Sequence, residues 1–228
     1  MYFSKEERDT LISYYGYDKS KLIFSTPGYD QKIFFPISKE YSRKKLNINS
    51  DQKIILFVGR LDYLKGLDIT IETIKISKKH NKFYKLLIAG GDLGSNQQDK
   101  LNLILKKNNI DQQIHWLGSL AQEKLNLAYN SADIVVVSSR SETFGLVCLE
   151  SIATKTPVIA SDVGRMKDMI INYDSGVLIS NIEPLKFYDE IEEYFNNKYP
   201  FKFSEESLEK IKNFKWESVF NQLLSKII

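Results

Sequence analysis

The central part of the chain alternates between two apolar patterns. Short runs such as Ile54–Val58 and Ile134–Val137 contain no polar residue. The longer segments between them space their apolar residues by three or four positions, as Leu67, Ile71 and Ile74 do. Continuous apolar runs are typical of strands buried on both faces, and the wider spacing is typical of helices that cover such strands.

This alternation predicts an α/β fold with a doubly wound parallel sheet (Rossmann-like). The expected strands are 54–58, 84–89, 114–117, 134–137, 157–160 and 177–179. The expected helices are 66–80, 97–108 (with Leu101, Ile104 and Leu105 on one face), 122–130, 145–154 and 167–171. In such a sheet, ligands bind at the carboxyl ends of the strands.

The two ends of the chain follow other patterns. Residues 4–15 form a predicted helix that begins at a capping box, Ser4 with Glu7. A strand-like run at 21–24 follows, and the polar stretch 36–52 has the character of a linker. Beyond the sheet we expect helices at 184–196 and 204–228, the second with an apolar stripe formed by Trp216, Val219, Phe220, Leu223 and Ile227.

Composition narrows the class of protein. The 228 residues are 43% hydrophobic and 27% charged, which is ordinary for a soluble globular protein. The absence of a long apolar run or a signal peptide, together with the single Cys148, fits a cytoplasmic protein. A net charge of +3 gives no reason to expect nucleic-acid binding. His80 and His115 lack partners at ligand spacing, so no metal is expected.

Two loops at predicted strand ends carry phosphate-binding chemistry. The first strand leads into 59–66, where Gly59 permits close backbone approach, Arg60 offers a bidentate fork and Lys65 adds a point charge. The second strand leads into the glycine-rich loop 90–94, which does not match the dinucleotide-binding fingerprint.

The fourth strand leads through a polar turn into a helix that begins near Gly145. A helix start at the end of a strand favours anion binding. Glu142 lies in the turn, where an acid is commonly a simple surface residue. Glu150 lies on an apolar helix and needs a partner, either a ligand or a structural salt bridge to Lys155 or Arg140.

An ordered set of motifs carries a family resemblance. The set is Gly59-Arg60 with Lys65-Gly66, Gly90-Gly91, Leu117-Gly118, and Glu142-Thr143-Phe144-Gly145-Leu146 ending at Glu150. With these motifs the chain resembles the C-terminal half of a two-domain family 4 glycosyltransferase, the retaining group with two Rossmann-type domains. The resemblance extends from about Lys21 to about Ile179.

The resemblance implies a role for each matching residue. Arg60, Lys65 and Glu142 would be catalytic: the first two would hold the donor diphosphate, and Glu142 would lie near the transferred sugar. Gly59, Gly90, Leu117, Phe144, Gly145, Leu146 and Glu150 would bind the donor, with Glu150 accepting from ribose hydroxyls. The chain contains no Asp-x-Asp motif, so the basic pair would replace a metal, and no cofactor is expected.

The same resemblance implies a division of the chain. Residues 1–20 would be a remnant of the preceding acceptor domain, 21–52 hinge and linker, 53–200 the nucleotide-sugar-binding domain, and 201–228 a crossover helix. The acceptor domain itself is expected before residue 1. Departures from the family pattern are Ser151, Lys155 and Arg165; Arg165 would contact phosphate or acceptor, or point to solvent.

The expected function is transfer of a sugar, with retention, from a UDP-, GDP- or ADP-sugar to a glycan or lipid acceptor. The expected partners are that donor, an acceptor domain or subunit, and a membrane surface reached through that other half. Self-association through the Trp216 stripe is also expected. The alternative is a nucleotide-sugar-binding module that is inactive alone. A related epimerase or phosphorylase is disfavoured by the paired glutamates.

Overall fold

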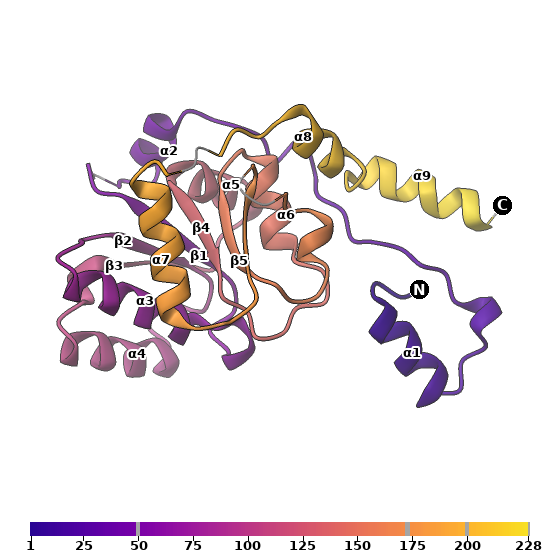
Figure 1. Ribbon diagram of the computed structural model, residues 1–228, viewed down its shortest axis with the longest axis horizontal. Coiled ribbons are helices and arrows are strands. Elements are labelled where there is room, and N and C mark those ends of the chain that lie inside the picture. Colours follow the sequence, from indigo (N-terminus) through magenta and orange to yellow (C-terminus); the bar gives the residue numbers. More distant parts are fainter. Residues whose placement is uncertain (49–50, 172–173, 199–200, 228) are drawn as a thin grey trace.

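A six-stranded parallel sheet forms the centre of the protein (Figure 1). This computed structural model describes residues 1–48, 51–171, 174–198 and 201–227. The strands are β1 Ile54–Val58, β2 Lys85–Ala89, β3 Ile114–Gly118, β4 Ile134–Val137, β5 Val158–Ser161 and β6 Gly176–Ile179. Their order is β3-β2-β1-β4-β5-β6, and neighbouring strands pair in parallel. The predicted doubly wound α/β fold is confirmed.

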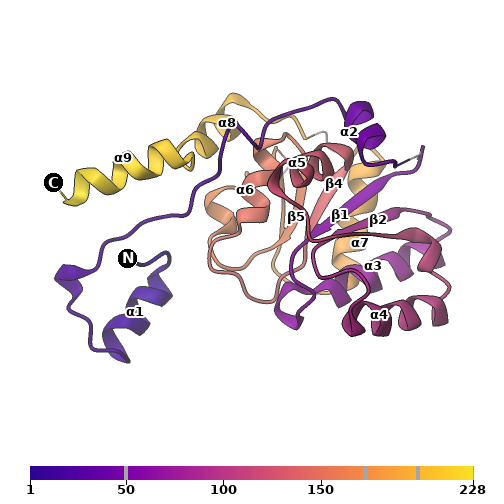
Figure 2. The ribbon, with the colours of Figure 1, turned by 180° about the vertical axis from the view of Figure 1, so that it is seen from behind.

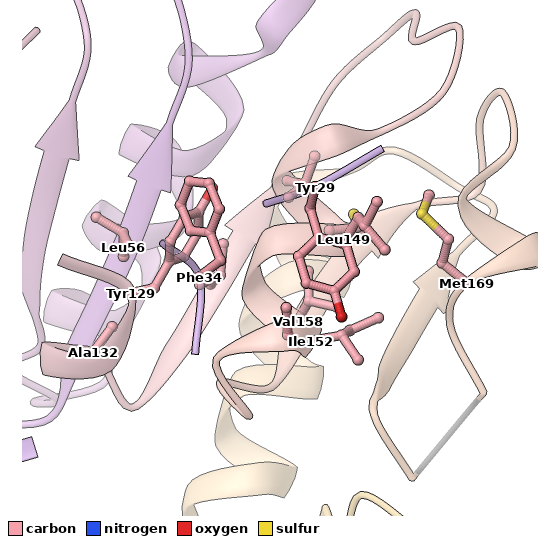
Figure 3. Close-up of a cluster of buried hydrophobic side chains, with 14 of the residues drawn as sticks. Tyr29, Phe34, Leu56, Tyr129, Ala132, Leu149, Ile152, Val158 and Met169 are labelled. Atoms are coloured by element: carbon pink, nitrogen blue, oxygen red, sulfur yellow. The ribbon is translucent and has the colours of Figure 1, made fainter. Parts of the chain in front are cut away.

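Helices cover both faces of the sheet. They are α3 Leu67–Lys79, α4 Asn96–Lys107, α5 Gln122–Ser131, α6 Leu146–Ala153 and α7 Pro184–Phe195, with 3-10 turns at Tyr63–Lys65, Asp111–Gln113 and Met166–Asp168. Successive side chains of β1 point to opposite faces: Leu56 packs with residues of α5 and α6, and Phe57 packs with residues of α3 and α7. Figure 3 shows part of the first of these two cores, with Leu56 beside Tyr129.

Two details of the expected helices are wrong. On α4, Leu105 is buried but Ile104 is 51% exposed, because a helix that covers one face of the sheet buries only a narrow stripe. The helix expected at 167–171 is a single 3-10 turn, Met166–Asp168.

The strand order reverses between β1 and β4, which pair through Ile55 with Ile134 and Leu56 with Val135. The loop after β1 and the loop after β4 therefore leave the same edge of the sheet, at the point where the order reverses. Such a switch point is where open α/β sheets bind ligands.

The N-terminal segment lies apart from the sheet, on the side toward which α9 projects (Figures 1 and 2). Helix α1, Lys5–Ser13, begins as predicted: the Ser4 hydroxyl accepts from Glu7 N–H at 3.0 Å, and Glu7 Oε2 accepts from Phe3 N–H at 2.6 Å. The strand expected at 21–24 is wrong. The 3-10 turn Lys19–Lys21 takes its place, and Phe24 makes one isolated bridge, to Tyr2.

The expected linker at 36–52 contains a helix, α2, Lys39–Lys45. Lys39 Nζ and Arg43 Nη2 lie 2.6 and 3.0 Å from the Asp133 carboxylate. Asp133 also accepts from the N–H of Ile54 at 2.7 Å, at the start of β1. Asp133, which is distant in sequence, therefore neutralises basic side chains of α2. The sequence of residues 36–52 alone does not indicate this partner.

The single helix expected at 204–228 is wrong, since two helices occur, α8 Glu205–Lys212 and α9 Trp216–Ile227. Between these helices the backbone pairs with that of Tyr29. The Tyr29 N–H donates to Phe214 O at 2.9 Å, and the Tyr29 carbonyl oxygen accepts from Trp216 N–H at 3.2 Å. On α9, Val219 is buried, whereas Trp216 and Phe220 are 53% and 59% exposed. The side chain of Ile227 lies outside the described residues. Among the helices described, none is long and apolar enough to cross a membrane.

Candidate active site

Loops from β1 and β4 meet at the switch point through a close backbone contact. Gly66 has a φ of +70°, and a Cβ atom there would lie 1.9 Å from the carbonyl oxygen of Ser138. The Ser138 hydroxyl donates to Gly66 O at 2.7 Å and lies 2.7 Å from the Thr70 hydroxyl. Only glycine fits this left-handed position against another backbone. The Lys65-Gly66 motif therefore docks its loop onto the end of β4.

Lys65 and Glu142 form an ion pair across this junction. Lys65 Nζ lies 2.5 Å from Glu142 Oε2, and the two side chains are 23% and 18% exposed. The Asp62 carboxylate accepts from the N–H of Lys65 at 3.0 Å and fixes the turn that carries it. Two residues predicted to share a site are thus in direct contact, although 77 positions separate them.

Arg140 strengthens the same junction. Its guanidinium nitrogens lie 2.7 and 2.5 Å from the two Asp68 oxygens, and Nη1 donates to Tyr63 O at 2.8 Å. The guanidinium carbon also lies 3.9 Å from the centre of the Tyr63 ring. A planar, bidentate group is suited to such a clamp, which ties the loop carrying Glu142 to the loop carrying Lys65.

Arg60 stands apart from this pair. Its side chain is 79% exposed, and its ion pair within the described residues is with Asp62 at 3.0 Å. The structure does not bring Arg60 into contact with Lys65 or Glu142. The guanidinium is thus available to an anion that approaches from solvent.

A shallow cavity of about 250 Å³ opens beside Arg60, at the ends of β1, β2 and β3. Its lining residues are Val58, Gly59, Arg60, Ala89, Gly90, Gly91, Ser119, Leu120 and Leu125. Gly90 has a φ of +135°, and its Cβ would lie 1.9 Å from Gly59 O, so bare backbone forms the floor. Leu117, a predicted donor-binding residue, lies on β3 and packs its side chain against the core.

The sequence analysis did not predict three residues that line this cavity beside predicted ones: Ser119, Leu120 and Leu125. The available signal was their position, since Ser119 and Leu120 directly follow the strand that ends at Gly118. The Ser119 hydroxyl donates to Gly91 O at 3.1 Å and links the loops after β2 and β3.

The loop after β4 leads into α6 through Phe144 and Gly145. Phe144 is 4% exposed and packs edge-on against Phe214 at 5.5 Å between ring centres, which anchors the loop. Gly145, with a φ of +98°, occupies the N-cap position of α6 and has no side chain to cap the first turn. Leu146 follows and is 40% exposed. The start of α6 is thus held at the switch point of the sheet by a buried ring, with the positive end of its dipole at that edge.

Glu150 is satisfied by a residue that the sequence did not indicate. The Tyr129 hydroxyl donates to Glu150 Oε2 at 2.7 Å. Neither expected salt bridge forms, because Arg140 binds Asp68 and Lys155 makes no contact with Glu150. Burial raises the pKa of Glu150 to about 7, and the Tyr129 hydrogen bond opposes that rise.

Arg165 does not point freely to solvent, because other groups of the protein hold its guanidinium. Its Nε lies 2.6 Å from Asp168 Oδ2, and its guanidinium lies over the rings of Phe24 and Phe144 at 4.8 and 5.6 Å. It also donates to Phe3 O at 3.3 Å. Arg165 therefore joins the N-terminal segment to the loop that contains Glu142.

Comparison with known proteins agrees with this arrangement. A family model described as glycosyl transferases group 1 matches residues 38–214. A D-inositol 3-phosphate glycosyltransferase of Mycolicibacterium smegmatis is 33% identical over 221 residues, which are 96% of this chain and 50% of that protein. The chain therefore spans about half the length of the relatives it matches.

Solved structures share the fold. Sucrose-phosphate synthase of Thermosynechococcus elongatus superposes with a TM-score of 0.79 at 25% identity, over 99% of this chain and 57% of that one. Anabaena HepE, solved in complex with UDP and glucose, gives a TM-score of 0.84 at 17% identity, over 99% of this chain and 61% of that one. With a parallel sheet whose strand order reverses between β1 and β4, and a family match over most of its length, this chain belongs to the glycosyl transferase group 1 family.

Proposed function

We propose that this chain is the donor-binding half of a retaining glycosyltransferase, and that it holds a nucleotide-diphospho-sugar at the switch point of the sheet. The observation that carries the proposal is the Lys65–Glu142 ion pair, which lies between the ends of β1 and β4. It places an ammonium group where the fold binds ligands and beside the start of α6. HepE, solved in complex with UDP-glucose, supplies the donor class by analogy, and the D-inositol 3-phosphate glycosyltransferases supply the reaction type.

The proposed chemistry is electrostatic. The bond between the anomeric carbon and the diphosphate oxygen breaks, and its electron pair stays on the diphosphate. An acceptor hydroxyl oxygen bonds to the anomeric carbon on the face from which the diphosphate leaves, and its proton passes to the departing diphosphate oxygen. Lys65 and Arg60 stabilise the charge on the departing diphosphate. Lys65 does so from a partly buried site, where a preorganised cation is most effective, and the exposed Arg60 reaches the diphosphate from solvent. Glu142 keeps Lys65 in place and faces the sugar.

Glu150 has a separate role in this proposal. It lies five positions after Gly145 on α6, which is about 7.5 Å along a helix axis. That length is close to the span from a diphosphate at the helix start to the ribose. Its carboxyl therefore accepts from ribose hydroxyls while Lys65 contacts the diphosphate.

The experiment that tests donor binding is calorimetric titration of the purified chain with UDP, GDP and ADP. One of the three is expected to bind, with affinity reduced in Lys65→Ala. Failure of all three to bind contradicts the proposal. In an enzyme reconstituted from this chain and an acceptor-binding domain, Lys65→Ala or Glu142→Ala should abolish transfer, and unchanged turnover would rule the proposed roles out.

The second candidate is a nucleotide-sugar-binding module that needs another domain for activity. The exposed Trp216 and Phe220 of α9 favour it, because they offer an apolar surface for such a domain. Assaying the chain alone for donor hydrolysis and transfer separates the two candidates. Binding without either reaction supports the module.

A further inference from the structure

We infer that Tyr129 is a positioning residue for Glu150: its hydroxyl holds one carboxyl oxygen so that the other faces the ribose hydroxyls of the donor. This inference rests on the proposed function, in which Glu150 contacts the ribose. It assigns to a residue of the core a measurable effect on nucleotide recognition.

The hydrogen bond from Tyr129 occupies one carboxyl oxygen of Glu150 and leaves the other without a protein donor among the described residues. Tyr129 lies on α5 and Glu150 on α6, and the 2.7 Å contact joins the Tyr129 hydroxyl to Oε2. Among the described residues, the Glu150 side chain makes no other hydrogen bond or ion pair. Oε1 is therefore the acceptor that remains for a ligand.

Tyr129 can hold the carboxyl because its own ring is fixed. The side chain is fully buried, and its ring meets the ring of Phe34 edge-on at 6.0 Å (Figure 3). Its carbonyl oxygen accepts from the Thr156 hydroxyl at 2.9 Å. A ring packed on its faces and tethered at its backbone directs the hydroxyl along one line.

The hydrogen bond also favours the charged form of Glu150. Donation to a carboxylate stabilises the anion, whereas burial disfavours it. The pKa values of Tyr129 and of the neighbouring Cys148 are raised by burial, so both stay neutral across the pH range in which Glu150 titrates. Glu150 is thus the group in this pair whose charge changes near neutral pH, and its anion is the stronger acceptor for ribose.

The test compares ribose recognition in Tyr129→Phe and in the unmodified protein. Calorimetric titrations use UDP, GDP and ADP together with their 2′-deoxy forms. The unmodified protein should prefer the ribonucleotide by about tenfold, as expected for a hydrogen bond to a charged group. In Tyr129→Phe the preference should fall to about twofold, because Glu150 is neutral and free to rotate.

Titrations over a range of pH separate this role from a purely structural one, because a purely structural role of Tyr129 would not change the pH dependence of nucleotide binding. The affinity for the ribonucleotide should increase with pH as Glu150 ionises. In Tyr129→Phe this increase in affinity should occur at higher pH, because the hydrogen bond that favours the anion is lost. Glu150→Gln should remove the rise altogether. Tyr84→Phe is the matched control, since the buried Tyr84 also donates its hydroxyl to a carboxylate, that of Glu192, but belongs to the core on the other face of the sheet; its loss should leave preference and pH profile unchanged.

Each outcome decides the inference. An unchanged ribose preference in Tyr129→Phe overturns it, and so does equal weakening of both nucleotide forms, which marks a packing role only. If the unmodified protein binds no nucleoside diphosphate, the proposed function fails and the inference with it. Should Tyr129→Phe not fold, a fluorinated tyrosine at 129 replaces it: a more acidic hydroxyl should move the pH rise downward, and no movement overturns the inference.

Discussion

Lys65 Nζ lies 2.5 Å from Glu142 Oε2, at the point where the loop after β1 meets the loop after β4. Each residue has a side chain less than a quarter exposed, so the pair is only partly screened by water. The contact joins two sequence motifs at the switch point of the sheet. Its two members should respond differently to substitution.

Lys65→Ala should weaken nucleoside diphosphate binding by about 10-fold to 100-fold, since it removes a charge-assisted contact to phosphate. Glu142→Ala should retain or strengthen that binding, because it frees the ammonium, and should still abolish transfer. Calorimetry measures the first effect and a transfer assay the second. The control is Lys75→Ala: Lys75 also pairs at 2.5 Å and is 23% exposed, but its partner is Glu72 on the same helix. Equal losses in Lys65→Ala and Lys75→Ala would contradict the assignment.

Gly66→Ala should destabilise the protein by about 3 kcal/mol, through left-handed strain and a backbone collision with Ser138. Gly94→Ala is matched to it. The φ of Gly94 is +75°, close to that of Gly66, but a Cβ there would meet nothing within 4 Å. Strain alone should cost about 1 kcal/mol in that variant. Urea unfolding measures both, and similar values for the two would show that the loop contact does not matter.

The stability of the protein should fall between about pH 4.5 and pH 7 because of Glu150. Its folded pKa, about 7, lies above its ordinary value of 4.5, so the folded state binds the proton more tightly than the unfolded state does. The stabilisation is complete below pH 4.5 and is lost as the pH rises through 7. Each pKa unit is worth about 1.4 kcal/mol, so the loss is at most about 3 to 4 kcal/mol. Unfolding of Glu150→Gln should lack this component, and parallel pH curves for the two proteins would contradict it.

The chain should self-associate through α9 when no other domain covers that helix. Trp216 and Phe220 are more than half exposed. Sedimentation velocity should detect a concentration-dependent shift that Trp216→Ser with Phe220→Ser removes. Phe83→Ser, at a site with 55% exposure elsewhere on the surface, should leave the shift intact. A chain that stays monomeric at high concentration argues against an association surface on α9.

Much of this protein was predictable because the signals are local. The apolar runs Ile54–Val58 and Ile134–Val137 form strands where the pattern puts them. The Ser4 cap of α1 forms within one helical turn, although Glu7 accepts from the N–H of Phe3 rather than from that of Ser4 as a capping box requires. The motif residues that meet at the switch point follow strands, and parallel strands present their carboxyl ends at one edge. These features depend on neighbours in sequence or on the general geometry of the fold.

What only the tertiary structure decided are the partners. Glu150 was expected to need one, and the structure supplies Tyr129 in place of Lys155 or Arg140. The backbone at Phe214, between α8 and α9, hydrogen-bonds to Tyr29. Asp133 forms ion pairs with Lys39 and Arg43 of α2. Each of these contacts joins residues far apart in the chain. The periodicity of apolar residues shows which face of a helix or strand is buried. It does not show which group will hydrogen-bond a buried polar side chain, because any group of suitable chemistry can do so. The packing of the whole chain determines which group lies within reach.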